Sequence, residues 1–428
     1  MRPEEDDIGS VLGVDDDLLA LALRVRETIQ PQLRRVEDIA RFNTARVLEA
    51  FKSAGLGDQH FGGTTGYGYD DTGRDALERA FAKVFEAEAA LVRVQIVSGT
   101  HALAAVMFGI LRPGDLLVSA FGSPYDTMRT VIGNDAPSRG SLAEFGVEYA
   151  EVAPDDRGEP DLSAISKACC DARMVLVQRS RGYARRRALT LADIDRIAHA
   201  ARMRNPRVVV VVDNCYGEFT DTHEPTSHGA DIVAGSLIKN PGGGVAPAGG
   251  YIAGNRELVE MAAERLTAPG LGSHVGPSLG LTRQLALGLF LAPLTTAEAI
   301  AGSIFAAEFL ASLGFVVYPE PGSRRSDIVL GVRLETPENV TAFCRAVQES
   351  SPVDASAVPE PAPMPGYSDQ VVMAAGTFTQ GASIELSADA PLRPPYDVYL
   401  QGGLSRHQVE FAMLRFAQAI RRKPRQVG

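Results

Sequence analysis

The feature that most constrains the fold is an unbroken run of five valines at residues 208–212, which ends in Asp213. A continuous β-branched run is typical of a strand that is buried on both faces of a sheet. Helical patterns separate several of the other apolar runs, and Thr190 is placed to cap the helix over 190–203. This alternation predicts an α/β fold with a mainly parallel sheet as the middle of three layers. The other expected strands lie at 92–97, 115–121, 174–180, 231–239 and 249–254.

The pattern changes after about residue 290, where helices at 296–313 and 337–350 are followed by a hairpin over 373–389. The chain then closes in an amphipathic helix. Near the start of the chain, a mostly helical stretch is broken at Pro31. We therefore expect three parts, namely an N-terminal helical arm at 1–55, a large α/β domain at 56–290 and a small C-terminal α+β domain at 291–428.

Composition excludes several classes of function. Lys and Arg number 42 against 53 Asp and Glu, so the chain carries a formal charge of −11 and offers no basic surface to nucleic acid or anionic lipid. No run of about 18 apolar residues is present, and the start of the chain is acidic. The four cysteines have no C-x-x-C spacing and the histidines are scattered, so no metal site is expected. These features predict a cytoplasmic protein without nucleic-acid or membrane partners.

The segment 231–254 contains the most informative residue, because Lys239 ends an apolar strand directly before a Gly-rich turn. A lysine at such a position also occurs as a surface residue whose stem covers apolar atoms. Asp213, however, ends the valine strand, where open α/β sheets bind their ligands. Ser98, Gly99 and Thr100 lie between a strand and a helix start, where backbone N–H groups can hold a phosphate.

Ser236, three residues before Lys239, can add a hydroxyl to the same phosphate. A lysine, a strand-end aspartate and a phosphate cradle are together what pyridoxal phosphate requires, since the lysine forms a Schiff base and the carboxylate pairs with the pyridinium nitrogen. The glycine patterns of dinucleotide-binding and P-loop proteins are absent.

The order of several motifs resembles the methionine γ-lyase family protein group, also called the aluminium-resistance protein group. The resemblance implies a fold type I pyridoxal-phosphate enzyme related to the cystathionine lyases, with an active site shared across a homodimer or homotetramer. The motifs are SGTHAL, FGSPYDT, QRSRGYA, VDNCYGEF, GSLIKNPGGG, TAPGLGSHVG and GTFTQGASIELSAD, followed by RPPYDVYLQGG.

The resemblance also assigns roles to residues. It makes Lys239 the Schiff-base lysine and Asp213 the partner of the pyridinium nitrogen, and it gives the phosphate to Gly99, Thr100 and Ser236. Tyr125 matches the tyrosine that stacks on the cofactor ring and protonates the leaving group. Tyr69 and Arg74 resemble the pair that reaches a neighbouring subunit's phosphate. Arg393 is the candidate for the substrate carboxylate, which arginine binds bidentately.

Two motifs depart from the family pattern, and they add substrate-site candidates. His274 stands where an acidic residue is expected, and Arg185 and Arg187 stand where an aromatic residue and a proline are expected. Tyr67 shares a face with Tyr69 in an extended segment, which is also compatible with packing on the core. Arg179 directly follows a predicted strand and is a further candidate, although most charge runs are solvated.

The expected activity is therefore a β- or γ-elimination from an amino acid. Three alternatives stay open at this stage. The leaving group can be a halide in place of a thiolate, the reaction can be transamination or γ-substitution, or the fold can serve a non-catalytic binding or metal-tolerance protein.

Overall fold

The computed structural model describes residues 5–134, 138–364 and 369–421, and these divide into two compact units. One unit runs from Arg41 to Pro293, and the other joins the described residues up to Ala40 with those from Leu294 onward. The unit boundaries fall inside the long helices α3 (Gln30–Ala54) and α10 (Thr282–Ser312).

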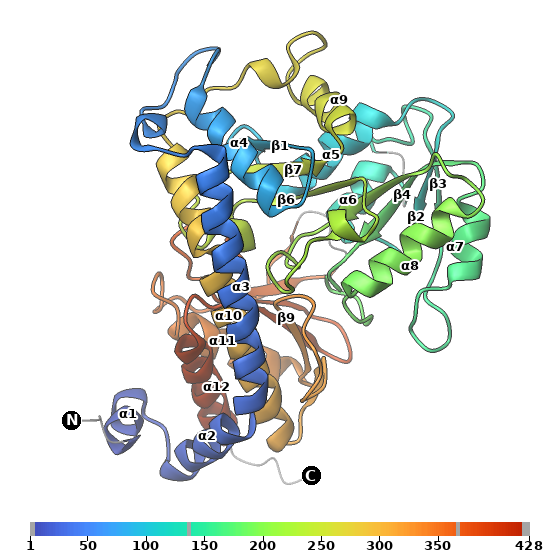
Figure 1. The fold of residues 1–428 in the computed structure, drawn as a ribbon. Coiled ribbons are helices and arrows are strands. Elements are labelled where there is room, and N and C mark those ends of the chain that lie inside the picture. Colours follow the sequence, from blue (N-terminus) through green and yellow to red (C-terminus); the bar gives the residue numbers. More distant parts are fainter. Residues whose placement is uncertain (1–4, 135–137, 365–368, 422–428) are drawn as a thin grey trace. The chain divides into compact units, whose positions relative to one another are not determined.

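The first unit holds the expected sheet. In the described part of the chain, seven strands follow the order β1-β7-β6-β5-β4-β2-β3, and the pairs among β6, β5, β4, β2 and β3 are all parallel (Figure 1). Strands β1 and β7 pair antiparallel with their neighbours. The strands are β1 (Ala89–Arg93), β2 (Leu116–Ser119), β3 (Glu148–Glu151), β4 (Ala172–Gln178), β5 (Val209–Asp213), β6 (Ile232–Ser236) and β7 (Gly250–Gly254).

Helices cover both faces of this sheet, as the valine run predicts. Val210 and Val212 of β5 belong to a buried cluster with α4 and α8, whereas Val209 and Val211 belong to a second cluster with α5 and α9. The strand is therefore buried on both sides, and the three-layer prediction is confirmed. The helices of this unit besides α3 and α10 are α4 (Thr72–Val84), α5 (Gly99–Ile110), α6 (Asp126–Ile132), α7 (Leu162–Ala168), α8 (Leu191–Arg202) and α9 (Arg256–Leu266).

The second unit contains an antiparallel sheet of order β10-β11-β12-β9-β8 among the described residues. The expected hairpin is present, since β10 pairs antiparallel with β11. The elements of this unit are α1 (Glu5–Leu12), α2 (Asp16–Thr28), β8 (Val316–Tyr318), β9 (Val329–Arg333), α11 (Pro337–Glu349), β10 (Val371–Ala374), β11 (Ser387–Pro391), β12 (Asp397–Gln401) and α12 (Arg406–Arg421).

The N-terminal segment differs from the expected arm at 1–55, because α2 packs on α12 of the same unit. Arg26 Nε donates to Glu410 Oε1 at 3.0 Å, and the backbone N–H of Asp15 donates to Gln418 Oε1 at 3.0 Å. These contacts join the start of the chain to its last helix, so the first helices form part of the C-terminal unit rather than a part of their own.

Two expected elements have other bounds. The apolar run at 92–97 leaves the sheet after Arg93, because its partner β7 begins at Gly250, opposite Arg93. The helix expected at 296–313 starts at Thr282 and contains Pro293. This helix, α10, is long and apolar enough to span a membrane by length and composition alone. In the described structure, however, 72% of its most apolar window is buried, as in the core helix of a globular domain.

Thr190 caps α8 as predicted, and its partner Asp193 is a buried carboxylate that pairs with the partly exposed Arg187 and Arg196. Asp193 accepts from the backbone N–H of Thr190 at 2.9 Å and from Nη2 of Arg187 at 3.0 Å. Burial acts against ionisation, but the hydrogen bonds from Arg187, Thr190 and Arg196 hold the pKa of Asp193 below its usual range.

We predict that Asp193→Asn lowers the free energy of unfolding at pH 6 by about 2 kcal/mol, because charge-assisted hydrogen bonds are lost. A lowered native pKa stabilises the fold above the ordinary aspartate pKa of about 4, and that stabilisation is lost as the pH falls below it. The difference in free energy of unfolding between wild type and variant should therefore be about 1 kcal/mol smaller at pH 3 than at pH 6, as measured by urea titration. Asp195→Asn, at an exposed position of the same helix, is the control and should show no such narrowing.

Candidate active site

Three neighbouring parallel strands end in polar residues at one edge of the large sheet. Ser236 ends β6, Asp213 ends β5 and Gln178 ends β4, and the β4–β5 register places Gln178 opposite Asp213. All three side chains are buried. The carboxyl ends of strands are where open α/β sheets bind ligands, so the edge holds polar groups at the expected location.

Lys239 follows the end of β6 and extends toward the residues after β5. Its Nζ lies 3.9 Å from the centre of the Tyr216 ring, a cation–π contact. Burial alone would lower the pKa of the Lys239 ammonium, but Cys215, Tyr216 and Asp213 around it raise this pKa above the usual range. The amine thus belongs to the strand-end cluster and is not a solvent-facing surface lysine.

Asp213 is almost fully buried and accepts the backbone N–H of Cys215 at 3.1 Å. Burial raises the pKa of its carboxyl above the ordinary aspartate range, and the nearby cations Lys239 and Arg186 oppose this shift. An ionised carboxylate at this depth is stable only with a positive partner. A pyridinium nitrogen is a partner of that kind.

The N-terminus of α5 opens at the same edge. A Cβ added to Gly99 would lie 3.1 Å from Cys215 Sγ and 3.5 Å from Ser236 Cβ, so the first turn of the helix touches the ends of β5 and β6. The unpaired N–H groups of this turn favour an anion. Ser98 accepts the backbone N–H of His101 at 3.0 Å and thereby caps the helix, a role that the sequence prediction of a phosphate contact did not include.

Tyr125 joins the helix start to the strand ends. Its hydroxyl lies 2.9 Å from Thr100 Oγ1, and its backbone N–H donates to Gln178 Oε1 at 2.9 Å. Burial, followed by Asp213 and Cys215, raises the pKa of the Tyr125 phenol well above its usual range. The phenol therefore stays protonated at neutral pH. Sequence reasoning missed Gln178, although its place at the end of a predicted strand next to β5 is the signal that could have found it.

This donor set fits pyridoxal phosphate. The amine of Lys239, the buried carboxylate of Asp213 and the open helix start at Gly99 and Thr100 meet at one edge, with a hydroxyl of Ser236 beside them. Tyr125 is held over the same region by Thr100 and Gln178.

A second group of predicted residues lies on two loops that pack on each other. Arg74 is buried, and its Nη1 donates to the carbonyls of Gly68 at 2.7 Å and Gly276 at 3.1 Å. The guanidinium thus ties residues 63–71 to residues 272–281 within one chain. Tyr67 and Tyr69 are exposed and stack with ring centres 5.5 Å apart. The expected contact of Tyr69 and Arg74 with a neighbouring subunit's phosphate stays a prediction, as does the substrate contact of Tyr67.

The remaining substrate candidates belong to three separate segments of the chain. His274 ends a short 3₁₀ turn on the second of these loops and is exposed. Arg393 belongs to the other compact unit, is largely exposed, and donates Nη1 to Asp369 Oδ2 at 3.0 Å. Arg187 pairs with Glu159 and with Asp193, so the charge that replaces the expected proline has a structural partner.

The structure does not support Arg179 as a substrate-site residue, which the sequence predicted. Its side chain is only 1% exposed and is held by polar groups of the interior. Nη1 donates to Asn214 Oδ1 at 2.8 Å and lies 3.8 Å from Glu224, and Nη2 donates to Thr220 Oγ1 at 3.1 Å. Glu224 is fully buried and depends on this cation and on Arg46. Arg179 is therefore engaged in the fold and does not present its guanidinium to a substrate.

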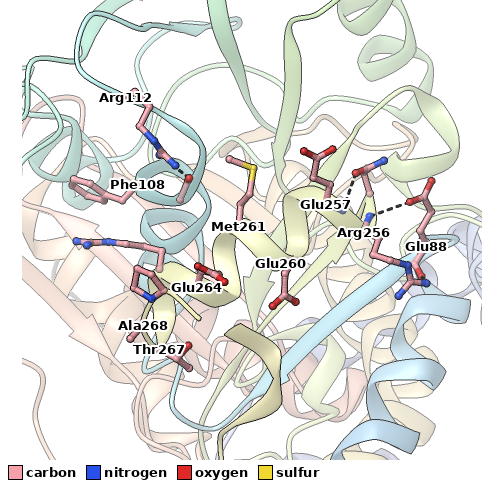
Figure 2. A pocket seen from close by; sticks show the side chains of 14 residues that line it. Glu88, Phe108, Arg112, Arg256, Glu257, Glu260, Met261, Glu264, Thr267 and Ala268 are labelled. Atoms are coloured by element: carbon pink, nitrogen blue, oxygen red, sulfur yellow. Dashed lines mark hydrogen bonds between the residues drawn. The ribbon is translucent and has the colours of Figure 1, made fainter. Parts of the chain in front are cut away.

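The hollow in Figure 2 lies elsewhere in the same unit, over α9 and the end of α5. It measures about 920 Å³ and is lined by charged side chains, among them Glu257, Glu260 and Glu264 of α9. Arg256 donates its backbone N–H to Glu88 at its rim. None of the strand-end residues lines it, so it is separate from the candidate active site.

Comparison with known proteins agrees with the motif order. The model of the family described as methionine gamma-lyase matches residues 18–421. The chain belongs to the methionine γ-lyase family.

Members with solved structures are similar over nearly their whole length. A protein named as a carbon–sulfur lyase involved in aluminium resistance, from Clostridium novyi, is 42% identical with a TM-score of 0.94, and the match covers 98% of this chain and 100% of that one. A Listeria monocytogenes protein, provisionally named cystathionine β-lyase, is 47% identical with a TM-score of 0.91 over 93% and 99% of the two chains.

More distant and less characterised relatives complete the comparison. Bacillus subtilis YnbB, named as uncharacterised, is 44% identical over 94% of this chain and 96% of its own. Yeast cystathionine γ-lyase, 18% identical with a TM-score of 0.57 over 82% and 86% of the chains, shares the fold. The family and fold type I predictions are confirmed.

The assignment of Arg179 to the fold is testable. Arg179→Met should lower stability by about 3–5 kcal/mol, since it leaves Glu224 buried with one cation fewer. Urea denaturation measures this loss, and Arg185→Met, at an exposed neighbouring position, should change stability by less than about 0.5 kcal/mol. A variant at position 179 that keeps its stability but loses substrate affinity would restore the sequence prediction.

Proposed function

We propose that this member of the family is a pyridoxal-phosphate-dependent lyase that eliminates a group from Cβ or Cγ of an amino acid. The observation that carries the proposal is the meeting of Lys239, Asp213 and the α5 N-terminus at one sheet edge. The names of two related solved structures, a carbon–sulfur lyase and a cystathionine β-lyase, support a thiolate-type leaving group.

The residues that would hold the cofactor follow from the site. Lys239 would bind it covalently through Nζ, Asp213 would pair with its ring nitrogen, and Gly99, Thr100 and Ser236 would hold its phosphate. When bound, pyridoxal phosphate acts as an electron sink that makes the Cα–H bond of an amino acid acidic.

The chain's own groups then move protons. Once a substrate amine had taken its place on the cofactor, Lys239 would be released as a neutral amine, and its Nζ could then accept the Cα proton. The groups around Nζ would stabilise the ammonium that this transfer forms. Tyr125 Oη stays protonated because its pKa is raised, so it can deliver a proton to a thiolate as the carbon–sulfur bond breaks. The Thr100 hydroxyl, 2.9 Å away, orients that phenol.

Product analysis tests the proposal. Purified protein supplied with pyridoxal phosphate should absorb at about 420 nm and should release a 2-oxo acid with ammonia from at least one member of a panel of thioether and halogenated amino acids. Lys239→Ala should lose both the band and turnover while its circular dichroism stays that of wild type. Lys167→Ala, at an exposed position of α7, is the matched control and should keep both.

The alternatives give distinct outcomes. Amino transfer to a second acceptor, or exchange of the γ-substituent without release of ammonia, would contradict the elimination. A protein that neither binds the cofactor nor turns over any substrate would contradict the enzyme proposal as a whole.

Tyr125→Phe separates the two kinds of leaving group. We expect turnover of a thioether substrate to fall about 100-fold, since the thiolate loses its proton donor, whereas a halogenated substrate should lose much less because halide leaves unprotonated. In the wild type the raised pKa of Tyr125 should keep the thioether rate free of a phenol titration up to about pH 10. Equal losses on both substrates would show that Tyr125 only supports the site.

A further inference from the structure

The proposed mechanism gives no role to Arg186, although this arginine acts electrostatically on Asp213. Its guanidinium lies over the Phe121 ring, with Cζ 5.4 Å from the ring centre, and its Nη1 donates to the Phe121 carbonyl. Phe121 follows the end of β2, so this arginine lies at the same carboxyl edge as Asp213 and Gln178. The ring and the carbonyl fix one side of the guanidinium.

The other side of the guanidinium has donors without an acceptor. Nε and Nη2 of Arg186 are buried, and neither has a hydrogen-bond partner among the residues that the structure describes. These two N–H groups form one edge of the planar fork, the edge that receives both oxygens of a carboxylate. Buried donors are nearly always satisfied, so this edge is incomplete until an acceptor arrives.

The charges around Arg186 connect its guanidinium with the strand-end residues. Asp213, Tyr149 and Glu151 all act electrostatically on it. Asp213 is buried, whereas Glu151 is exposed on the edge strand β3. Burial lowers the pKa of Arg186 to about 10, so the side chain remains positive at neutral pH. Arg186 is therefore a permanent cation near the strand-end carboxylate of Asp213.

We propose that the Nε–Nη2 edge of Arg186 binds a carboxylate of the amino-acid substrate. The inference rests on the proposed function, since it assigns a substrate contact to the same site. The carboxylate is either the α-carboxylate or a second carboxylate on the side chain, and both would make the same bidentate pair. Among the arginines that follow β4, Arg186 replaces Arg179 as the substrate-site candidate, and it takes the carboxylate that the sequence prediction gave to Arg393.

Calorimetric titration of the cofactor-loaded protein with unreactive ligands tests this. The probes are 4-(methylthio)butanoate, glutarate and the neutral 4-(methylthio)butanamide, none of which carries an amine that could react. Arg186→Gln should weaken the carboxylates about 10- to 100-fold and leave the amide unchanged. Arg186→Lys keeps the positive charge but lacks the planar fork. Its affinities for the two carboxylates should therefore fall between those of the wild type and those of Arg186→Gln. Arg157→Gln, the same charge change at an exposed position of the same unit, should bind as wild type.

The pattern of loss identifies the carboxylate. An equal loss for 4-(methylthio)butanoate and glutarate means that the fork holds the α-carboxylate, and a loss confined to glutarate means that it holds a side-chain carboxylate. Wild-type affinity of Arg186→Gln for both acids would overturn the proposal. If that variant does not fold, Arg186→Lys decides in the same way.

Cofactor affinity, measured in parallel by fluorescence titration, separates this inference from the proposed function. It should change less than about threefold in Arg186→Gln, because the fork is assigned to the substrate. A selective loss of cofactor affinity, with carboxylate binding intact, would also overturn the inference. Absence of the absorbance band in wild type would refute the proposed function, whereas the carboxylate titration can still be carried out on that protein.

Discussion

The buried carboxylate of Asp213 is the constraint on which the site depends. The valine strand that carries it is covered on both faces, so its end can hold a charge only if cations and N–H donors surround it. Lys239, Arg186 and the Cys215 N–H supply these within the chain. The helix start at Gly99 and the Tyr125 phenol pack around the same point. A cationic ring nitrogen would complete this environment.

A network of buried polar side chains next to the site stabilises the turn that follows β5. Its members are Arg179, Asn214, Glu218, Glu224 and Tyr251. Asn214 donates to Glu224 at 3.0 Å and accepts from Arg179, and the Tyr251 hydroxyl donates to Glu218 at 2.8 Å. Burial raises the pKa of Glu218 to about 8, so this carboxyl is largely protonated at neutral pH. Because such groups are costly to leave unpaired, the network fixes the turn that follows β5 and thereby the position of Asp213.

The sequence predicts the sheet, the strand-end aspartate and the lysine well, because each follows from a local pattern. It cannot predict which of the arginines at 179–187 is held by the interior of the fold and which keeps donors unsatisfied. That difference depends on how the loop after β4 packs against residues that are distant in the sequence. Arg179 is taken by Asn214 and Glu224, whereas Arg186 packs on Phe121 with one edge unsatisfied. The assignment of residues 5–40 to the C-terminal unit likewise depends on long-range pairs such as Arg26 with Glu410, which no local pattern encodes.

The attachment of the cofactor to one amine is the central claim, and peptide mass spectrometry of borohydride-reduced holoprotein tests it most directly. The account predicts that the added mass of the reduced cofactor is found on the peptide that contains Lys239, with fragment ions that place it on that side chain. Added mass on another lysine, or on none after full loading with pyridoxal phosphate, would contradict it.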